Sequence, residues 1–458
     1  MINNKVWHER YSGKKYYEDD GSFYMRTPYE RDRARIIHNS SFRSLQHKTQ
    51  LFNIEDSDKT HTRLTHTLEV SQISNGLLRV IKAKYDPEFR RYYDAESRLV
   101  ENDYLNADLE LRKLIQAYLP PDALMESICL THDIGHAPFG HSGEYALCSL
   151  MYYSGGFEGN AQTFRVLTRL ANYSREYGLD LTRRTLLGVI KYPFVFEEFP
   201  EKLTPEQLKQ NDNIKIIKGI YKDDQDVFNW VLAPLSEADS QRFQEYVIKD
   251  NRPVTLHKSF DCSIMELADD IAYSVHDLED AVNILEVERE DWEEFFANYH
   301  DPQVREIFAE LVEKKYIPED YVDRLFSKDI IVRRQIYSTL IDILTSHVMV
   351  RKKNIFSEPL LDLEAYLPEK ISKVCKFLKE LEYNIPILSQ DIRGVNNRGK
   401  NMLAKCFTNI QSNPYILGRK KSLQYFALES QKQRNRFICD FLATMTNFEL
   451  SDFYAKYI

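Results

Sequence analysis

The 458-residue sequence has no uninterrupted apolar run of about 18 residues, so we expect no membrane-spanning helix and no membrane partner. Its start, MINNKVWHERYSGKKYY, is polar and lacks the apolar centre of a secretory signal, and we expect a cytoplasmic protein. The six cysteines are scattered without a CxxC pair, which argues against a disulfide framework and against a zinc–cysteine site. The net charge of −9 argues against a generally basic, nucleic-acid-coated surface, but not against a local basic pocket.

Glycine and proline are also few, at 15 and 16 residues, and strand-like alternation of apolar and polar residues is scarce. Apolar residues instead recur at helical spacing in two stretches. They are Leu64, Leu68, Ile73 and Leu77 in the first, and Leu267, Ile271, Val275, Leu278 and Val282 in the second. The sequence therefore predicts a mainly α-helical fold with a few short β segments, and its 43% of hydrophobic residues can bury a large core.

Two stretches break this helical pattern. Residues 194–253 carry scattered prolines and mixed charge, and we interpret them as an insertion or lid. Residues 391–405, DIRGVNNRGKNMLAK, are polar and predict a loop that returns to a helix. No internal repeat is visible, so the chain forms either one large domain or two ordinary ones.

Four side chains of metal-ligand type lie in three separate segments. They are His66 in TRLTHTLEV, the adjacent His132 and Asp133 in CLTHDIGHAPFGH, and Asp269 in MELADDIAYSVHD. Two imidazoles and two carboxylates make a mixed nitrogen and oxygen site. Such a site suits Mn, Fe, Co, Ni or Zn and, less well, Mg.

The segment from residue 132 to residue 144 is dense in ionisable groups separated by glycines and a proline, which is more typical of an active-site floor than of a helix surface. Within it, His141 and Glu144 are three residues apart at the expected start of a helix. A carboxylate at this spacing can orient the imidazole and raise its pKa, which suits a general acid near neutral pH.

The order H…HD…D resembles the HD-domain superfamily of metal-dependent phosphohydrolases. Further blocks resemble one branch of it, the deoxynucleoside triphosphate triphosphohydrolases of the bacterial dGTPase type. They are WHERYSG, RTPYERDRARIIHNSSFRSL, FRSLQHKTQLF, THTRLTHTLEVSQI, HDIGHAPFGHSGE, FEGNAQTFRVLTRL, IKYP and ELADDIAYSVHDLEDAV, with a weaker echo in RFICDFLATMTNFEL. The resemblance implies an HD-domain helical fold, with a catalytic region at 1–290 and a helical region at 291–458 that contributes to an oligomer and to the substrate pocket.

The resemblance also implies a role for the four ligands. His66, His132, Asp133 and Asp269 are expected to hold a divalent ion, with Mn, Mg or Co favoured and Fe, Ni or Zn also compatible. Arg63 shares a helix face with His66. It could pair with a surface carboxylate, whereas the resemblance places its guanidinium on the substrate triphosphate.

Further phosphate and base contacts follow from the same resemblance. Lys191 and Tyr192 of IKYP match phosphate contacts, although a lysine alone would be interpreted as solvated, and Lys218 is a second candidate lysine. Gln50 and Leu51 lie where relatives hold the sugar and the edge of the base.

Two helical residues match contacts to the sugar. Asp269, Tyr273 and Asp277 are spaced four residues apart and form one stripe on a helix, which could also be a solvated polar face. The resemblance assigns Tyr273 and Asp277 to the deoxyribose 3′-hydroxyl.

The resemblance places the His141–Glu144 pair beside the scissile phosphate, as a general acid and its orienting group. His136 either contacts a phosphate or supports the metal ligands. Asn160 and Gln162 are expected near the catalytic centre in a supporting role. The remaining histidines that we interpret as structural or surface residues are His38, His47, His257, His276, His300 and His347.

The predicted reaction is the hydrolysis of dGTP, or of another dNTP, to a deoxynucleoside and tripolyphosphate by attack of a metal hydroxide on the α-phosphorus. The alternatives are another HD-domain nucleotide phosphohydrolase or phosphodiesterase, and a catalytically silent nucleic-acid-binding HD protein. The resemblance further implies a homo-oligomer, a hexamer or a dimer. A basic N-terminal segment could bind a single-stranded DNA effector, or could equally be a salt-bridged helix.

The tail departs from the usual pattern of the family. Relatives often carry a Gly-Met-Thr-Asp run there, whereas this chain has Thr444-Met445-Thr446-Asn447. We therefore transfer no tail contacts to it.

Overall fold

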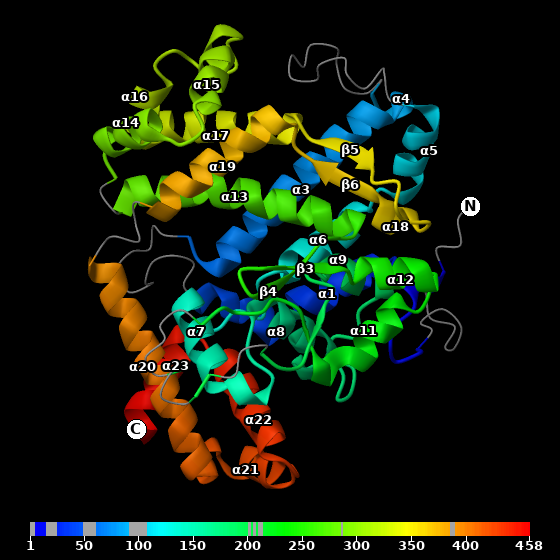
Figure 1. The fold of residues 1–458 in the computed structure, drawn as a ribbon, viewed down its shortest axis with the longest axis vertical. Helices are drawn as coiled ribbons and strands as arrows, with labels where there is room; N and C mark the ends of the chain where they lie inside the picture. The colour runs from blue at the N-terminus through cyan, green and yellow to red at the C-terminus, as the bar shows by residue number, and fades with distance from the viewer. Residues whose placement is uncertain are drawn as a thin grey trace.

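The computed structural model describes residues 5–14, 25–48, 61–90, 108–199, 203–204, 208, 214–284, 287–384 and 390–458. Within these ranges the side chains at 90, 277, 283–284, 382–384 and 390–396 lie outside the description. The described chain is built mainly from α-helices with a few short strands, which confirms the mainly α-helical prediction (Figure 1).

The part of the chain before residue 250 contains one long helix, α3, and ten shorter α-helices among the described residues. They are α1 (Pro28–Ile37), α2 (Ser40–Arg43), α3 (Arg63–Tyr85), α4 (Pro87–Arg90), α5 (Leu109–Tyr118), α6 (Asp122–Thr131), α7 (Gly140–Leu150), α8 (Gly159–Arg165), α9 (Arg183–Val189), α11 (Gln225–Leu232) and α12 (Glu237–Phe243). Helix α3 begins at a capping box in which Thr62 and Thr65 satisfy each other's backbone N–H groups.

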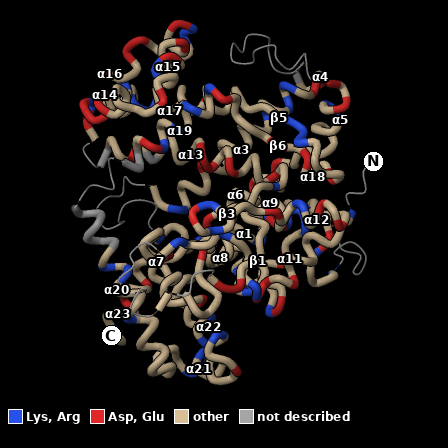
Figure 2. The backbone as a smooth tube through the Cα atoms, in the orientation of Figure 1, with Lys and Arg blue, Asp and Glu red and all other residues tan. Residues whose placement is uncertain are grey.

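The C-terminal half contains the longest helix, α13. Its helices are α13 (Phe260–Ile284), α14 (Arg289–Asn298), α15 (Gln303–Glu313), α16 (Tyr321–Leu325), α17 (Ile330–Ser346), α18 (Pro359–Asp362), α19 (Glu369–Asn384), α20 (Gln390–Ser412), α21 (Arg419–Phe426), α22 (Gln431–Ala443) and α23 (Asn447–Tyr457). Asp and Glu gather around α14, α15 and α16 at the upper end of the molecule (Figure 2).

The strands form three separate pairs among the described residues. Strand β1 (Val195–Phe196) pairs in parallel with β2 (Ile220–Tyr221). The other two pairs are antiparallel: β3 (Tyr246–Lys249) with β4 (Arg252–Thr255), and β5 (Met349–Lys352) with β6 (Leu363–Tyr366). Pairs this short cannot form a core by themselves, so the helices carry the fold.

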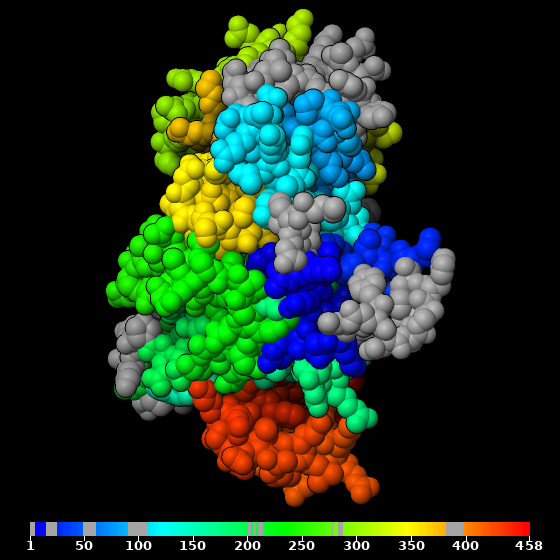
Figure 3. Space-filling view, turned by 90° about the vertical axis from the view of Figure 1, so that its right-hand side faces the viewer, coloured from blue at the N-terminus to red at the C-terminus, as the bar shows by residue number. Residues whose placement is uncertain are grey.

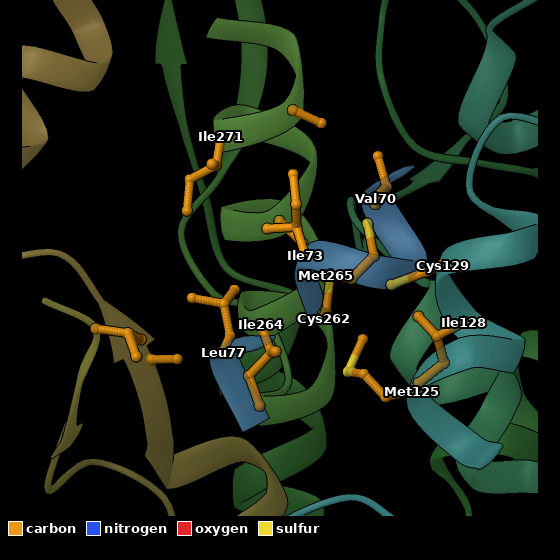
Figure 4. Packing of buried hydrophobic residues seen from close by; sticks show 14 of the residues in the cluster. Val70, Ile73, Leu77, Met125, Ile128, Cys129, Cys262, Ile264, Met265 and Ile271 are labelled. Atoms are coloured by element: carbon orange, nitrogen blue, oxygen red, sulfur yellow. The ribbon is translucent and has the colours of Figure 1, made fainter. Parts of the chain in front are cut away.

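The largest core lies where α3, α6 and α13 pack together. Val70, Ile73 and Leu77 of α3 meet Met125, Ile128 and Cys129 of α6 and Cys262, Ile264, Met265 and Ile271 of α13 (Figure 4). All ten side chains are buried. This core fixes the three helices whose ends and faces carry the predicted metal ligands.

A second core lies at the lower end of the molecule. It joins α7 and residues between 194 and 217 to the C-terminal helices α20, α22 and α23. The C-terminal helices form the orange and red lobe at the bottom of the space-filling view (Figure 3). The helices after residue 290 therefore divide between the two cores, with α14–α19 on the first and α20–α23 on the second.

The prediction of a loop at residues 391–405 was wrong, because helix α20 runs through it from Gln390 to Ser412. The glycine at 399 is explained by close packing and not by a turn. A Cβ atom at this position would lie 2.3 Å from Cγ of Phe139, so glycine lets α20 approach the residue before α7.

Residues 194–253 are also more regular than the sequence indicates. Their described part contains β1, β2, β3, α11 and α12. Phe228 of α11 and Phe243 at the end of α12 are fully buried in the first core. Among the described residues, no helix combines the length and apolarity that crossing a membrane requires.

Candidate active site

The four predicted metal ligands converge from three helices. His66 lies in the first turn of α3, His132 and Asp133 follow the end of α6, and Asp269 lies in the middle of α13. Nε2 of His66 is 3.2 Å from Oδ1 of Asp269, and Nε2 of His132 is 3.5 Å from the same oxygen. Ligand atoms of His66, His132 and Asp133 all lie within 4.8 Å of one another.

The orientation of His132 fits a metal ligand. Its Nδ1–H donates a hydrogen bond to the carbonyl oxygen of Cys129 over 2.7 Å, which fixes the tautomer. Nε2 therefore remains available to coordinate a metal ion through its lone pair. Nε2 is buried and has no hydrogen-bond partner in the described part of the chain. Burial alone would lower the pKa of His132, but Asp133 and Asp269 raise it to about 9, so this position strongly attracts positive charge.

Two cationic side chains contact the ligand carboxylates. Nη1 of Arg63 donates to Oδ2 of Asp133 over 2.6 Å, and Nζ of Lys191 lies 3.3 Å from Oδ2 of Asp269. Burial alone would raise the pKa of Asp133, but His136, His132 and Arg63 hold it well below its usual range. Both carboxylates are therefore ionised and able to bind a cation near neutral pH.

The loop after α6 is pressed against the start of α8. A Cβ atom at Gly135 would lie 2.1 Å from the backbone nitrogen of Thr163, so only glycine permits this approach. His136 is packed beside Gly159, and its Nδ1 is 3.2 Å from Oδ1 of Asp133. Burial lowers the pKa of His136 to about 4, so its imidazole is neutral near neutral pH.

His141 and Glu144 meet as the sequence spacing predicts. Nδ1 of His141 is 3.2 Å from Oε2 of Glu144, and the backbone N–H of Gly159 donates to Oε1 of the same carboxylate over 2.7 Å. The pKa of Glu144 is about 2, because His141 and His136 outweigh the effect of its burial. The His141 side chain is 79% exposed, so its ring can reach a bound molecule.

Three of the predicted phosphate contacts lie together beyond α9. Nζ of Lys218 donates to the hydroxyl of Tyr192 over 3.2 Å and lies 5.1 Å from the centre of its ring. Lys191 is adjacent in sequence and in contact with Asp269. The group therefore extends from the metal ligands toward β2 and adds two ammonium groups to one side of the site.

The predicted sugar and base contacts are only partly described. Tyr273 lies one turn after Asp269 on α13, and the Lys379 ammonium is 5.6 Å from the centre of its ring. Gln50, Leu51 and the side chain of Asp277 lie outside the described residues.

Asn160 and Gln162 are held by neighbouring carboxylates. The Asn160 amide donates to Glu158 over 2.6 Å. Gln162 is fully buried and donates to Oδ1 of Asp440 over 3.0 Å. Gln162 thus connects α8 to the C-terminal helix α22, while its expected role in substrate binding stays a prediction.

The sequence interpretation missed two buried residues at this site. Lys48 donates to the carbonyl oxygen of His136 over 2.6 Å, and burial lowers its pKa to about 7. Glu158 accepts from the Ala161 N–H over 2.8 Å, and burial followed by the charge of Glu144 raises its pKa to about 7. Both lie inside resemblance blocks, but a single lysine or glutamate carries no periodic signal that distinguishes it from a solvated one.

Comparison with known proteins gives consistent matches over the whole chain. A model of the phosphohydrolase-associated domain matches residues 365–456. A deoxyguanosinetriphosphate triphosphohydrolase-like protein of Histophilus somni (strain 129Pt) is 37% identical over 463 residues, which cover 98% of this chain and 98% of the relative. Proteins described in the same words from Shewanella oneidensis and Haemophilus influenzae (strain PittGG) are 37% and 36% identical, over 97% and 98% of this chain and 96% and 95% of the relatives.

Proposed function

This chain belongs to the family of deoxyguanosinetriphosphate triphosphohydrolase-like proteins, and we propose that it hydrolyses dGTP to deoxyguanosine and tripolyphosphate. Membership of this family makes it a phosphohydrolase of the dNTP triphosphohydrolase type and confirms the resemblance found in the sequence blocks. The observation that carries the proposal is the convergence of His66, His132, Asp133 and Asp269 next to Arg63 and Lys191.

The family favours a divalent metal, and the four ligands fit one. His66, His132, Asp133 and Asp269 would hold the ion, and we propose Mn, Mg or Co as its identity. When bound, such an ion lowers the pKa of water and polarises a phosphoryl oxygen. Arg63 orients Asp133 through Nη1, so the ligand set is ordered by a second layer of hydrogen bonds.

The cationic side chains favour a triphosphate over a neutral substrate. Lys191, Tyr192 and Lys218 offer two ammonium groups and a hydroxyl on one side of the ligand cluster. Arg63 has a buried Nε with no hydrogen-bond partner among the described residues, so its guanidinium retains a donor beyond the one used on Asp133. These groups would offset the charge of the triphosphate and hold the α-phosphorus near the metal ligands.

His141 is the proposed acid. The Glu144 carboxylate is hydrogen-bonded to Nδ1 of the ring, so Nε2 remains available to deliver a proton. The oxygen of water forms the new bond to the α-phosphorus as the bond from phosphorus to O5′ breaks, and His141 protonates the departing O5′. The proton that the attacking water loses then restores the protonated His141 ring. The products balance as deoxyguanosine and tripolyphosphate.

The test is product analysis with a labelled solvent. The full-length protein is loaded with Mn²⁺, Mg²⁺ or Co²⁺ and incubated in H₂¹⁸O with one nucleotide at a time: dGTP, dATP, dCTP, dTTP or GTP. The products are separated by ion exchange, and their masses are measured by mass spectrometry. We expect deoxyguanosine and tripolyphosphate from dGTP, with the label in tripolyphosphate because water attacks phosphorus. Orthophosphate or pyrophosphate as the product would contradict the proposal and favour another nucleotide phosphohydrolase.

Two variants assign the roles. Asp133→Asn should abolish turnover because it removes a charged ligand. Glu144→Gln keeps an acceptor for the Gly159 N–H but loses the charge that orients His141, so kcat should fall by about 10²- to 10⁴-fold. His300→Gln, which changes a 63% exposed histidine far along the chain, is the matched control and should leave kcat unchanged.

A further inference from the structure

A second cluster of metal-ligand side chains lies on the same two helices as the candidate active site. It consists of His61, just before α3, Glu69 on α3 and His276 on α13. Nε2 of His61 is 3.0 Å from Oε1 of Glu69, and Nδ1 of His276 is 4.0 Å from Oε2 of Glu69. One potential ligand atom from each residue lies within 4.8 Å of the other two.

Asp280 holds His61 in one orientation. Oδ1 of Asp280 is 2.7 Å from Nδ1 of His61, and Oδ2 accepts the backbone N–H of the same residue over 3.0 Å. Asp280 is only 3% exposed, so this contact is protected from water. A buried carboxylate that takes Nδ1–H leaves Nε2 as the donor atom, which is the usual arrangement around a metal-binding histidine.

The cluster contains a polar atom that the protein does not satisfy. Oε2 of Glu69 is buried and has no hydrogen-bond partner within the described ranges. The nearby His276 nitrogen, at 4.0 Å, is beyond hydrogen-bond distance. A buried carboxylate oxygen without a partner is unfavourable, and a cation between Glu69 and His276 would satisfy both atoms.

We propose that His61, Glu69 and His276 bind a second divalent cation, of the Zn²⁺ or Co²⁺ type, with Asp280 orienting His61. Two imidazoles and one carboxylate make a three-ligand set with room for a water molecule, which suits zinc and cobalt and disfavours magnesium. The sequence interpretation of His276 as a structural or surface residue changes accordingly. The proposal does not depend on the reaction at the candidate active site.

The second cation would lie apart from the first. His66 and Glu69 are three residues apart on α3, and Asp269 and His276 are seven apart on α13. At the rise of an α-helix, these spacings correspond to about 4.5 Å and about 10 Å along the two axes. Ions that share a reaction lie about 3.5–4 Å apart. The spacing along α13 exceeds this separation, so we assign the second ion a structural role: it ties the residue before α3 to α13 and so fixes the turn that carries Arg63 and His66.

The competing interpretation needs no metal. Asp280 and then Glu69 raise the pKa of His61 to about 10, against the opposing effect of burial, so a protonated His61 could bridge the two carboxylates. That arrangement leaves the buried Oε2 of Glu69 without a hydrogen-bond partner among the described residues, with Nδ1 of His276 4.0 Å away. The two interpretations differ in the number of cations that each chain binds.

The test is metal stoichiometry. The full-length protein is stripped with a chelator, dialysed against buffered Zn²⁺, and its bound zinc is counted by plasma mass spectrometry. We expect two ions per chain in the wild type, and one in Glu69→Gln and in His276→Gln. The double variant His66→Gln, Asp133→Asn leaves only one imidazole and one carboxylate in the first site, so it should also bind one ion, and its combination with His276→Gln should bind none. His300→Gln is the matched control and should bind two.

A Co²⁺ titration of the His66→Gln, Asp133→Asn double variant followed by visible absorption provides a second readout, because a bound histidine-ligated Co²⁺ ion absorbs and a free one absorbs weakly. One Zn²⁺ per wild-type chain would overturn the proposal without any variant. Two ions that persist in both Glu69→Gln and His276→Gln would overturn it too. If one of these variants fails to fold by circular dichroism, the other decides. Absence of triphosphohydrolase activity would not change the counts, so failure of the proposed function is distinguishable from failure of this site.

Discussion

Lys48 illustrates how a single buried charge is built into the site. Its ammonium group donates to the carbonyl oxygen of His136 over 2.6 Å and to that of Ala443 over 3.0 Å. The residue is 1% exposed, and burial followed by the nearby Arg63 lowers its pKa to about 7. Lys48 therefore joins the loop after α6 to the end of α22. Its ammonium group loses its hydration on folding, which lowers the stability of the charged form.

The pH dependence of stability should reveal this cost. Because the folded-state pKa lies below the unfolded value, the unfolded chain binds the extra proton between about pH 7 and about pH 10.4, and stability rises with pH through that window. In urea unfolding at pH 7, 8 and 9, the free energy of unfolding of the wild type should rise relative to Lys48→Met by up to about 1.4 kcal/mol per pH unit.

The control for this prediction is Lys420→Met, which removes an exposed lysine. Its stability should follow that of the wild type across the same pH range. If the curves of the wild type and of Lys48→Met run parallel, Lys48 keeps its proton in the folded state and the assignment is wrong.

At the scale of elements, the close contact between the loop after α6 and helix α8 positions the candidate site. Gly135 faces the backbone of Gly159, Gln162 and Thr163, and the side chain of Thr163 accepts the Gly135 N–H over 3.0 Å. His132 and Asp133 lie in the same loop, just before Gly135. A change in the spacing of these two elements therefore moves the ligands.

Gly135→Ala should separate them. The added Cβ atom would lie 2.1–2.5 Å from backbone atoms that cannot rotate away, so the free energy of unfolding should fall by about 1–3 kcal/mol. Displacement of the loop by about 1 Å should lower kcat by about 10²-fold. Thermal unfolding and steady-state kinetics measure the two effects.

Gly76→Ala is the matched control, because a Cβ atom at Gly76 of α3 meets nothing within 4 Å. It should raise the free energy of unfolding by about 0.5–1 kcal/mol through the better helix propensity of alanine, with kcat unchanged. Equal effects of the two substitutions would show that the loop does not depend on the close approach.

At the scale of the whole molecule, the two hydrophobic cores are joined by a buried polar network. Asp440 of α22 accepts from Gln162 and from Nε of Arg165, and Nη1 of Arg165 also donates to Asp224 over 2.9 Å. Arg165 and Gln162 belong to α8, which borders the candidate site. The C-terminal lobe is thereby coupled to the segment that packs against the loop carrying the predicted ligands His132 and Asp133.

Asp440→Ala should weaken this coupling. It leaves the Gln162 amide unpaired and removes one of two carboxylates from the partly buried guanidinium of Arg165, so we expect a loss of about 3 kcal/mol in the free energy of unfolding. Limited proteolysis should then cleave α20–α23 before the rest of the chain. Urea unfolding of Asp440→Ala and of Asp452→Ala, an exposed carboxylate on α23, tests the prediction. Equal stability of the two variants would contradict it.

The sequence alone determined the helical class and singled out the candidate metal ligands. Helical spacing of apolar residues is a local property, and it predicted the helices α3 and α13 correctly, although Leu68 of the predicted apolar set is 50% exposed. The family blocks predicted His66, His132, Asp133 and Asp269 as ligands, because residue type and order are written directly in the chain, and the structure brings the four side chains together. The same reasoning failed at residues 391–405, where glycine and asparagine indicate a loop but packing against Phe139 stabilises a helix.

Only the tertiary structure decided which residues meet. Three features show this. Lys48 contacts the carbonyl oxygen of Ala443, 395 positions away, and Gln162 contacts Asp440. Likewise, His61 and Glu69, which are 8 positions apart, lie in one cluster with His276 and Asp280 of α13. The pKa values of Lys48 and His61 depend on desolvation and on neighbouring charges, which no local pattern encodes. The chain therefore specifies the chemical groups of the site, while the packing of α3, α6, α8, α13 and α22 sets their charge and their partners.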